Sequence, residues 1–179
     1  MLGLGRRTDT ALAGSTRDLY QRIVAQARVP LFYARYGVPD TPLGRFEMIA
    51  LHAFLVMRRL KREGAAEAEV SQALFDLMFA DVDRNLREMG IGDLGVGRRV
   101  KTLAKGFYGC IRAYESGLDA GTPGDALEAA LARNLYAGSP PEAAMLAAVA
   151  DYVRREDRAL LLRRAEDVMA GRFDFGAAG

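Results

Sequence analysis

The chain has 179 residues, half of them apolar and about a quarter charged, and its formal net charge is +2. This length and composition are ordinary for one globular domain with a sizeable core, and the low net charge excludes a protein that is basic overall. A single cysteine (Cys110) and a single histidine (His52) exclude an intramolecular disulfide and a structural zinc site built from Cys and His.

The expected secondary structure is helical throughout, because no segment alternates apolar and polar residues for long enough to predict a strand. The motif SPPE at residues 139–142 is a capping box with proline at the first helical position. The helices are expected at residues 16–29, 31–36, 43–63, 67–89, 97–118, 124–136, 141–155 and 157–170. We therefore predict an all-α, single-domain bundle of about seven to eight helices over 16–172, with a flexible N-terminus (1–15) and a frayed C-terminus (173–179).

The helix expected at 43–63 is apolar on almost all sides, which is typical of a central helix. His52 lies in its middle and is expected to be packed or hydrogen-bonded. In the next helix, Asp81 and Asn85 fall inside an apolar arc, so both are candidate buried polar residues. A carboxylate there must find a partner or shift its pKa, and the candidate partners of Asp81 are Arg35, Arg45 and His52.

The helix expected at 97–118 has a row of cations opposite its apolar face, with no acidic residue among them. Beside this row runs a strip of small residues that includes Gly106 and Gly109, and such a strip favours the close approach of another backbone. A charge run is usually a solvated face; the functional alternative is a docking surface for anionic lipid or ribosomal RNA phosphates. The candidate partner-binding basic surface comprises Arg58, Arg59, Lys61, Arg62, Arg98, Arg99, Lys101, Lys105 and Arg112.

The stretch Gly90–Gly95 matches the spacing G-x-G-x-x-G of a dinucleotide-binding loop. That fingerprint requires a strand before it, whereas here it follows a helical segment, so we interpret it as a turn between two helices. A dyad of His52 with Cys110, and haem ligation by His52, are the catalytic and cofactor alternatives to a packed histidine. No Glu-x-x-His occurs for a di-iron site. We predict no catalytic residue, no cofactor and no metal site.

Three blocks of the chain each have a distinctive amino-acid sequence. They are residues 32–60 (FYARYGVPDTPLGRFEMIALHAFLVMRRL), 71–115, which include LFDLMFADVDRNLREMGIGDLGVGRRVK, and 131–136 (LARNLY). Together these blocks resemble the ubiquinol–cytochrome c chaperone family, the assembly factors of the respiratory ubiquinol–cytochrome c reductase complex. The resemblance runs across about 32–136, more than half of the chain.

The resemblance implies a helical, non-enzymatic chaperone that protects newly made cytochrome b before it joins the complex. It also implies action at the ribosome near the membrane and a small partner subunit. The basic clusters make peripheral contact with an anionic membrane a further candidate, and no DNA partner is expected. The chain shows no long presequence, which favours a bacterial protein on the cytoplasmic side of the inner membrane. Two alternatives stay open: a helical adaptor for another membrane-protein client, and a small enzyme that uses His52 with Asp81 or Cys110.

Overall fold

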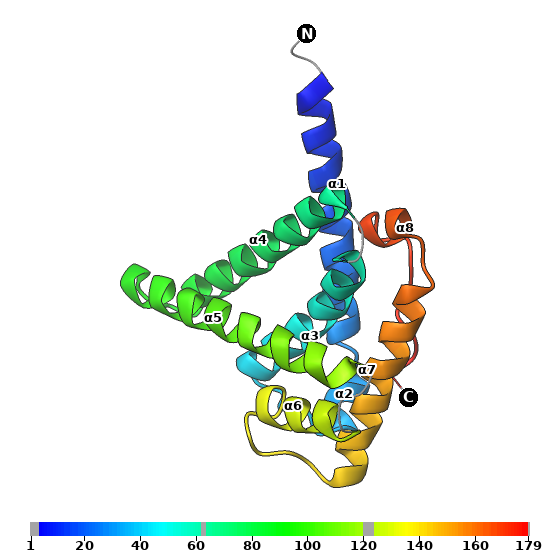
Figure 1. Cartoon of the computed structure of the whole chain (residues 1–179). Coiled ribbons are helices and arrows are strands. Elements are labelled where there is room, and N and C mark those ends of the chain that lie inside the picture. The colour runs from blue at the N-terminus through cyan, green and yellow to red at the C-terminus, as the bar shows by residue number, and fades with distance from the viewer. Residues whose placement is uncertain (1–3, 62–63, 120–123, 179) are drawn as a thin grey trace.

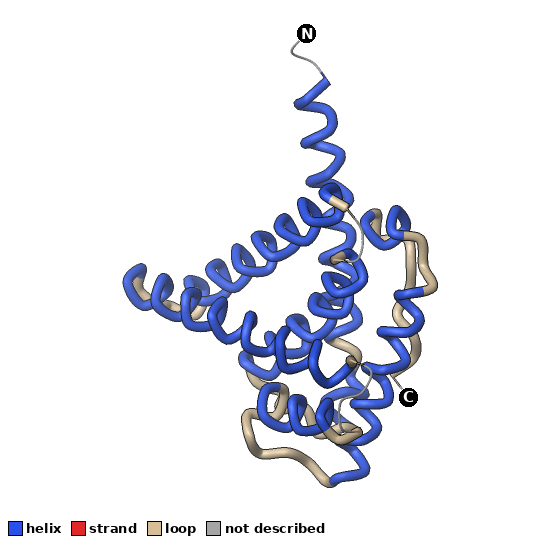
Figure 2. The backbone as a smooth tube through the Cα atoms, in the orientation of Figure 1, coloured by secondary structure: helices blue, strands red, loops and turns tan. Residues whose placement is uncertain are grey.

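The structure is a computed structural model, and it describes residues 4–61, 64–119 and 124–178. These residues form eight helices and no strand (Figures 1 and 2), so the predicted all-α, single-domain class is confirmed. In chain order the helices are α1 (Leu4–Ala27), α2 (Pro30–Ala34), α3 (Pro42–Leu60), α4 (Ala65–Glu88), α5 (Asp93–Leu118), α6 (Ala126–Asn134), α7 (Ala143–Leu161) and α8 (Ala165–Met169).

The central element is α3, which packs against α1, α4, α5, α7 and α8. Its start is set locally: Thr41 precedes Pro42 and its Oγ1 accepts a hydrogen bond from the Gly44 backbone N–H at 3.1 Å. Buried side chains then follow on nearly every side of the helix, from Met48 to Leu60. The expectation of a central helix is confirmed, because five helices pack against α3 and bury most of its side chains from Met48 to Leu60.

The pair α4 and α5 diverges from a tight turn. Gly90 adopts φ +79° directly after α4, a conformation that glycine tolerates best, and the Ile91 N–H donates to the Leu86 carbonyl at 3.2 Å. The two helices then separate, and α3 lies across the wide end of the triangle that they form (Figure 1). The Gly90–Gly95 stretch is thus an inter-helix turn that runs into α5, which begins at Asp93 rather than at the expected residue 97.

Several helix boundaries differ from the expectation. Helix α1 begins at Leu4 and not near residue 16, and α7 continues to Leu161 where a break near 156 was expected. The segment after α8 does not fray in the residues described: Phe173 is 4 % exposed, and Gly176 N–H donates to Glu156 Oε2 at 3.0 Å. A segment without helical periodicity is held by its aromatic side chains, and periodicity alone could not reveal that.

The small-residue strip on α5 is also placed differently. A Cβ added to Gly106 or Gly109 would meet no atom within 4 Å, so no backbone approaches the helix there. The close approach lies about two turns beyond Gly109, at Gly117, where an added Cβ would come within 2.7 Å of the Leu127 Cα on α6. No helix of the described residues is both long enough and apolar enough to cross a bilayer.

Candidate functional site

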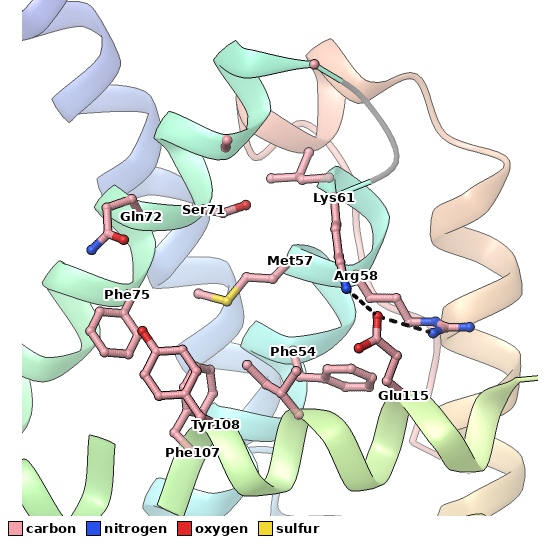
Figure 3. A pocket seen from close by; sticks show the side chains of 14 residues that line it. Phe54, Met57, Arg58, Lys61, Ser71, Gln72, Phe75, Phe107, Tyr108 and Glu115 are labelled. Atoms are coloured by element: carbon pink, nitrogen blue, oxygen red, sulfur yellow. Dashed lines mark hydrogen bonds and ion pairs between the residues drawn. The ribbon is translucent and has the colours of Figure 1, made fainter. Parts of the chain in front are cut away.

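An apolar cavity of about 330 Å³ lies between α3, α4 and α5, and we call it the central hollow. Figure 3 shows side chains from all three helices pointing into it. Because α4 and α5 diverge from their turn, their facing surfaces contact each other over only part of their length, and the cavity lies where they have separated. The apolar lining comes from Phe54, Met57, Leu60, Phe75, Phe107, Tyr108 and Ile111.

Aromatic rings of α4 and α5 form one wall of the central hollow. Phe75 stacks on Tyr108 with ring centroids 5.5 Å apart and also contacts Phe107 at 5.9 Å. Met57 reaches toward them from α3, and its flexible thioether adapts to irregular apolar surfaces. Phe75, Met57 and Ile111 are only partly buried, so the hollow offers apolar surface to a partner that can enter it.

Charged side chains close one end of the central hollow. Lys61 Nζ lies 2.9 Å from Glu115 Oε1 and is exposed. Arg58 is only 8 % exposed, and its guanidinium donates to Asp157 at 3.1 Å and to Asp119 at 3.2 Å. Arg58 therefore ties α3 to α7 and to the end of α5, which corrects its assignment to the partner-binding surface.

Arg59 requires the same correction. It is also 8 % exposed, and it donates to the carbonyl oxygens of Leu160 (3.1 Å) and Arg163 (2.9 Å). These carbonyls lie at the C-terminal end of α7, where helix carbonyls lack intrahelical partners and attract cations. Arg62 falls outside the described residues, so of this cluster only Lys61 is both described and exposed.

A second hollow of about 590 Å³ lies between α1, the start of α3, the end of α4 and the start of α5. Asp81 lines it, accepts a hydrogen bond from the Tyr20 hydroxyl at 3.0 Å and pairs with Arg84. These partners replace the expected ones, and Arg45, which lines the same hollow, pairs with Asp40 at 2.6 Å. Burial, followed by the charge of Asp81, raises the pKa of Tyr20.

Asn85 is exposed and not buried, which corrects the expectation of a buried polar residue. It lines the second hollow together with Asp81, so the polar interruption of the apolar arc of α4 faces an open hollow. Near its end, this face of α4 is not covered by the rest of the described residues, so helical periodicity alone does not bury Asn85.

His52 is fully buried, and both of its ring nitrogens have partners. Nδ1–H donates to the Met48 carbonyl at 2.8 Å, and because a carbonyl can only accept, Nε2 is left to accept from the Tyr152 hydroxyl, also at 2.8 Å. The Tyr152 oxygen in turn accepts from Gln26 at 2.9 Å. Burial lowers the pKa of His52 to about 4, so the imidazole is neutral at physiological pH.

Cys110 pairs with a carboxyl group and not with His52. Its Sγ lies 3.9 Å from Glu47 Oε2, and burial raises the pKa of the thiol to about 11. Burial likewise raises the pKa of Glu47 to about 7. Glu47 was not among the candidate residues expected from the sequence, although it is an acid that interrupts the apolar run of α3. Beside this pair, the buried Tyr114 hydroxyl has no hydrogen-bond partner within the described structure.

The proposed catalytic constellations are therefore not assembled. His52 bonds to Met48 and Tyr152, Cys110 to Glu47, and Asp81 to Tyr20 and Arg84, so no two of the three share a hydrogen bond. Among the residues that the structure describes, no group of three His, Cys, Asp or Glu side chains is placed to hold a metal ion.

The cations of α5 are all exposed, as a partner-binding surface requires. Arg98, Lys101, Lys105 and Arg112 lie on the outer face of the helix, and Arg99 lines the second hollow on a different face. Eight of the nine candidates are described: five exposed cations on α5, the exposed Lys61, and the buried pair Arg58 and Arg59 on α3.

Comparisons with known proteins give one consistent result. The sequence profile described as Ubiquinol-cytochrome C chaperone matches residues 34–175. The chain is 25% identical over 151 residues to ubiquinol-cytochrome c reductase complex assembly factor 1 of Mus musculus, covering 84% of this chain and 50% of that protein. It is 27% identical over 138 residues to the Xenopus laevis protein of that name, covering 77% and 68%. The chain therefore spans about half the length of the mouse relative.

A solved structure extends this likeness to the fold. The crystal structure of the Cbp3 homolog from Brucella abortus superposes with a TM-score of 0.86 at 41% identity, and the match covers 99% of this chain and 97% of that one. The matched profile spans all of α3 to α8, including the three helices that enclose the central hollow. On these grounds the chain belongs to the ubiquinol–cytochrome c chaperone family.

Proposed function

We propose that this protein is a non-enzymatic assembly chaperone of the ubiquinol–cytochrome c reductase complex, and that its client is newly made cytochrome b. Its family membership and the names of its relatives, which are assembly factors of that complex, support the first part. The choice of cytochrome b comes from the family resemblance. The chain would act on the cytoplasmic side of the inner membrane, with the ribosome near its tunnel exit and a small partner subunit as further candidate partners.

The observation that carries the proposal is the central hollow. A membrane-protein client exposes apolar segments until it is assembled, and covering them requires an apolar surface that is open to a partner and can adjust its shape. The hollow provides aromatic rings on α4 and α5 and a methionine on α3. Its charged end, where Lys61 and Glu115 pair, provides polar groups for the end of a bound segment.

A cavity-filling substitution tests this site without disturbing the core. Ala68 is exposed on α4 and lines the central hollow, so Ala68→Trp places an indole in the space that the client would occupy. Ala80 is exposed on the same helix and does not line the hollow, which makes Ala80→Trp the matched control. Each variant is returned to a strain from which the gene has been deleted.

We expect the deletion strain to lose assembled ubiquinol–cytochrome c reductase while its other respiratory complexes persist. Ala80→Trp should restore the complex and should co-purify newly made cytochrome b, whereas Ala68→Trp should do neither although it folds. Normal levels of the reductase in the deletion strain would refute the assembly function and favour an adaptor for another client. Full activity of Ala68→Trp would refute the central hollow as the client site.

A further inference from the structure

Helix α5 presents one continuous stripe of exposed side chains along its outer face. The stripe residues follow each other at steps of three or four, which places them within one narrow arc of the helix. From first to last the stripe covers eighteen residue steps, or about 27 Å of helix. Its members, which we call the α5 stripe, are Leu94, Arg98, Lys101, Lys105, Tyr108 and Arg112.

The four cations of the α5 stripe have no partner among the described side chains, although nearby arginines do. On α4, Arg84 pairs with Asp81, and Arg87 pairs with Asp83 at 2.6 Å. Between Asp93 and Glu115, α5 has five cations and no acid, whereas the whole chain has a net charge of only +2. A strip of unpaired positive charge on a nearly neutral protein is complementary to an extended anionic surface.

Exposed apolar side chains lie on the same stripe as the cations. Leu94 is 92 % exposed in the first turn of α5, and Tyr108 is 55 % exposed about four turns further along. Met89, which lies at the turn that joins α4 to α5, is 59 % exposed. Figure 1 shows that this turn is the part of α4 and α5 farthest from α7 and α8, so the rest of the protein does not shield it.

This combination distinguishes a lipid surface from a nucleic acid. Phosphates of RNA would be matched by the cations alone, and a leucine almost completely in water would contribute nothing to that contact. A bilayer surface uses both kinds of group, because anionic headgroups attract the cations while leucine and tyrosine side chains enter the boundary with the acyl chains. The apolar and cationic residues of the α5 stripe lie within one arc of the helix, with Tyr108 at the edge of the arc next to the central hollow.

We propose that the α5 stripe docks the protein on an anionic lipid bilayer, with Leu94 and Tyr108 at the acyl boundary and the four cations at the headgroups. Docking in this way is peripheral, and it does not depend on which client the central hollow binds. It would hold the hollow, which Tyr108 also lines, next to the membrane surface.

The test is flotation of the purified full-length chain with vesicles of phosphatidylcholine alone, or of phosphatidylcholine mixed with phosphatidylglycerol, at physiological ionic strength. The first variant is Arg98→Glu/Lys101→Glu/Lys105→Glu, and the second is Leu94→Ser. The charge-matched control reverses three exposed arginines on α1 and at the end of α7: Arg17→Glu/Arg158→Glu/Arg163→Glu. The apolar control is Leu162→Ser, since Leu162 is 89 % exposed just after α7. Circular dichroism confirms that each variant is folded.

We expect the wild-type chain to float with the anionic vesicles only, and less strongly as salt is added. The triple reversal on α5 should weaken the partition by well over tenfold, and Leu94→Ser should weaken it by about tenfold. Both control variants should float like the wild type. The proposal is overturned if the wild-type chain does not float with anionic vesicles, if the control reversal is as harmful as the α5 reversal, or if Leu94→Ser floats normally. Binding to purified ribosomes without binding to vesicles would likewise overturn it and assign the stripe to RNA.

Discussion

Three glycines of α5 are expected to respond in opposite ways to the same added methyl group. At Gly106 and Gly109, which face open space, a Cβ meets no atom within 4 Å. Replacing a glycine in an exposed helix interior by alanine stabilises the helix by about 1 kcal/mol, because alanine loses less backbone entropy on folding. Gly106→Ala and Gly109→Ala should therefore each raise the free energy of unfolding by about 0.5–1 kcal/mol.

At Gly117 the added Cβ would lie 2.7 Å from the Leu127 Cα and 3.0 Å from the Leu127 N. Both are backbone atoms of α6, so relief requires α5 and α6 to move apart, and overpacking of this kind costs about 1–3 kcal/mol. The helix-propensity gain is small there because Gly117 lies in the last turn of α5. We expect Gly117→Ala to lower the free energy of unfolding by roughly 1–2 kcal/mol.

The assay is urea unfolding followed by circular dichroism, with thermal unfolding as a second measure. For a chain of this length 1 kcal/mol corresponds to about 2–4 °C in Tm, so the opposite signs are resolved. A Gly117→Ala protein as stable as the wild type would refute the tight α5–α6 contact. A destabilised Gly106→Ala protein would instead support a packed small-residue strip, as the sequence pattern suggested.

Four further predictions concern buried groups. The pKa of His52 is lowered to about 4 in the folded protein, from 6.5. As the pH falls from 6.5 to 4, His52 therefore binds a proton in the unfolded chain but not in the folded one, and the free energy of unfolding decreases. Glu47, with a pKa raised to about 7 from 4.5, acts in the opposite direction and reduces stability as the pH rises from 4.5 to 7. Each contribution is up to roughly 3 kcal/mol. In urea titrations, the free energy of unfolding of Glu47→Gln should rise relative to the wild type as the pH rises, and that of His52→Gln should rise relative to the wild type as the pH falls. If either variant and the wild type show parallel dependences of this free energy on pH, the corresponding assignment is contradicted. Arg58→Ala should lower the free energy of unfolding by about 3–5 kcal/mol, because it leaves Asp157 buried without its partner. The double variant Arg58→Met/Asp157→Leu should lower it by less, and a double-mutant cycle measures the difference. Phe173→Ala should lower the free energy of unfolding by roughly 3 kcal/mol in the same assay. If the C-terminus were frayed, this substitution would leave the free energy of unfolding unchanged.

The helical class and the central place of α3 could be predicted because each depends on residues close together in the chain. Helical periodicity relates a residue to those three and four positions away, and caps such as Thr41 with Pro42 act within one turn. The exposed cationic row of α5 was predictable for the same reason, since an unbroken polar face of a long helix seldom has a neighbour to cover it.

The fate of the charged cluster at the end of α3 could not be predicted in this way. Arg58, Arg59 and Lys61 lie within one turn of each other at the end of α3, yet only Lys61 is exposed. The partner of Arg58 lies 99 residues away on α7, and Arg59 reaches carbonyls 101 and 104 residues away. The Tyr152 hydroxyl that occupies His52 is likewise 100 residues distant.

The amino-acid sequence by itself determined that this protein is all helical, where most of its helices lie, which face of α5 is charged, and to which family it is similar. Only the tertiary structure decided which cations are buried, that Gly117 and not Gly109 meets another helix, and that α3, α4 and α5 enclose a hollow. The physical reason is that helix formation follows from interactions within a few residues. Burial of a charge, or a gap between helices, depends instead on which distant segment arrives and on the angle at which it packs.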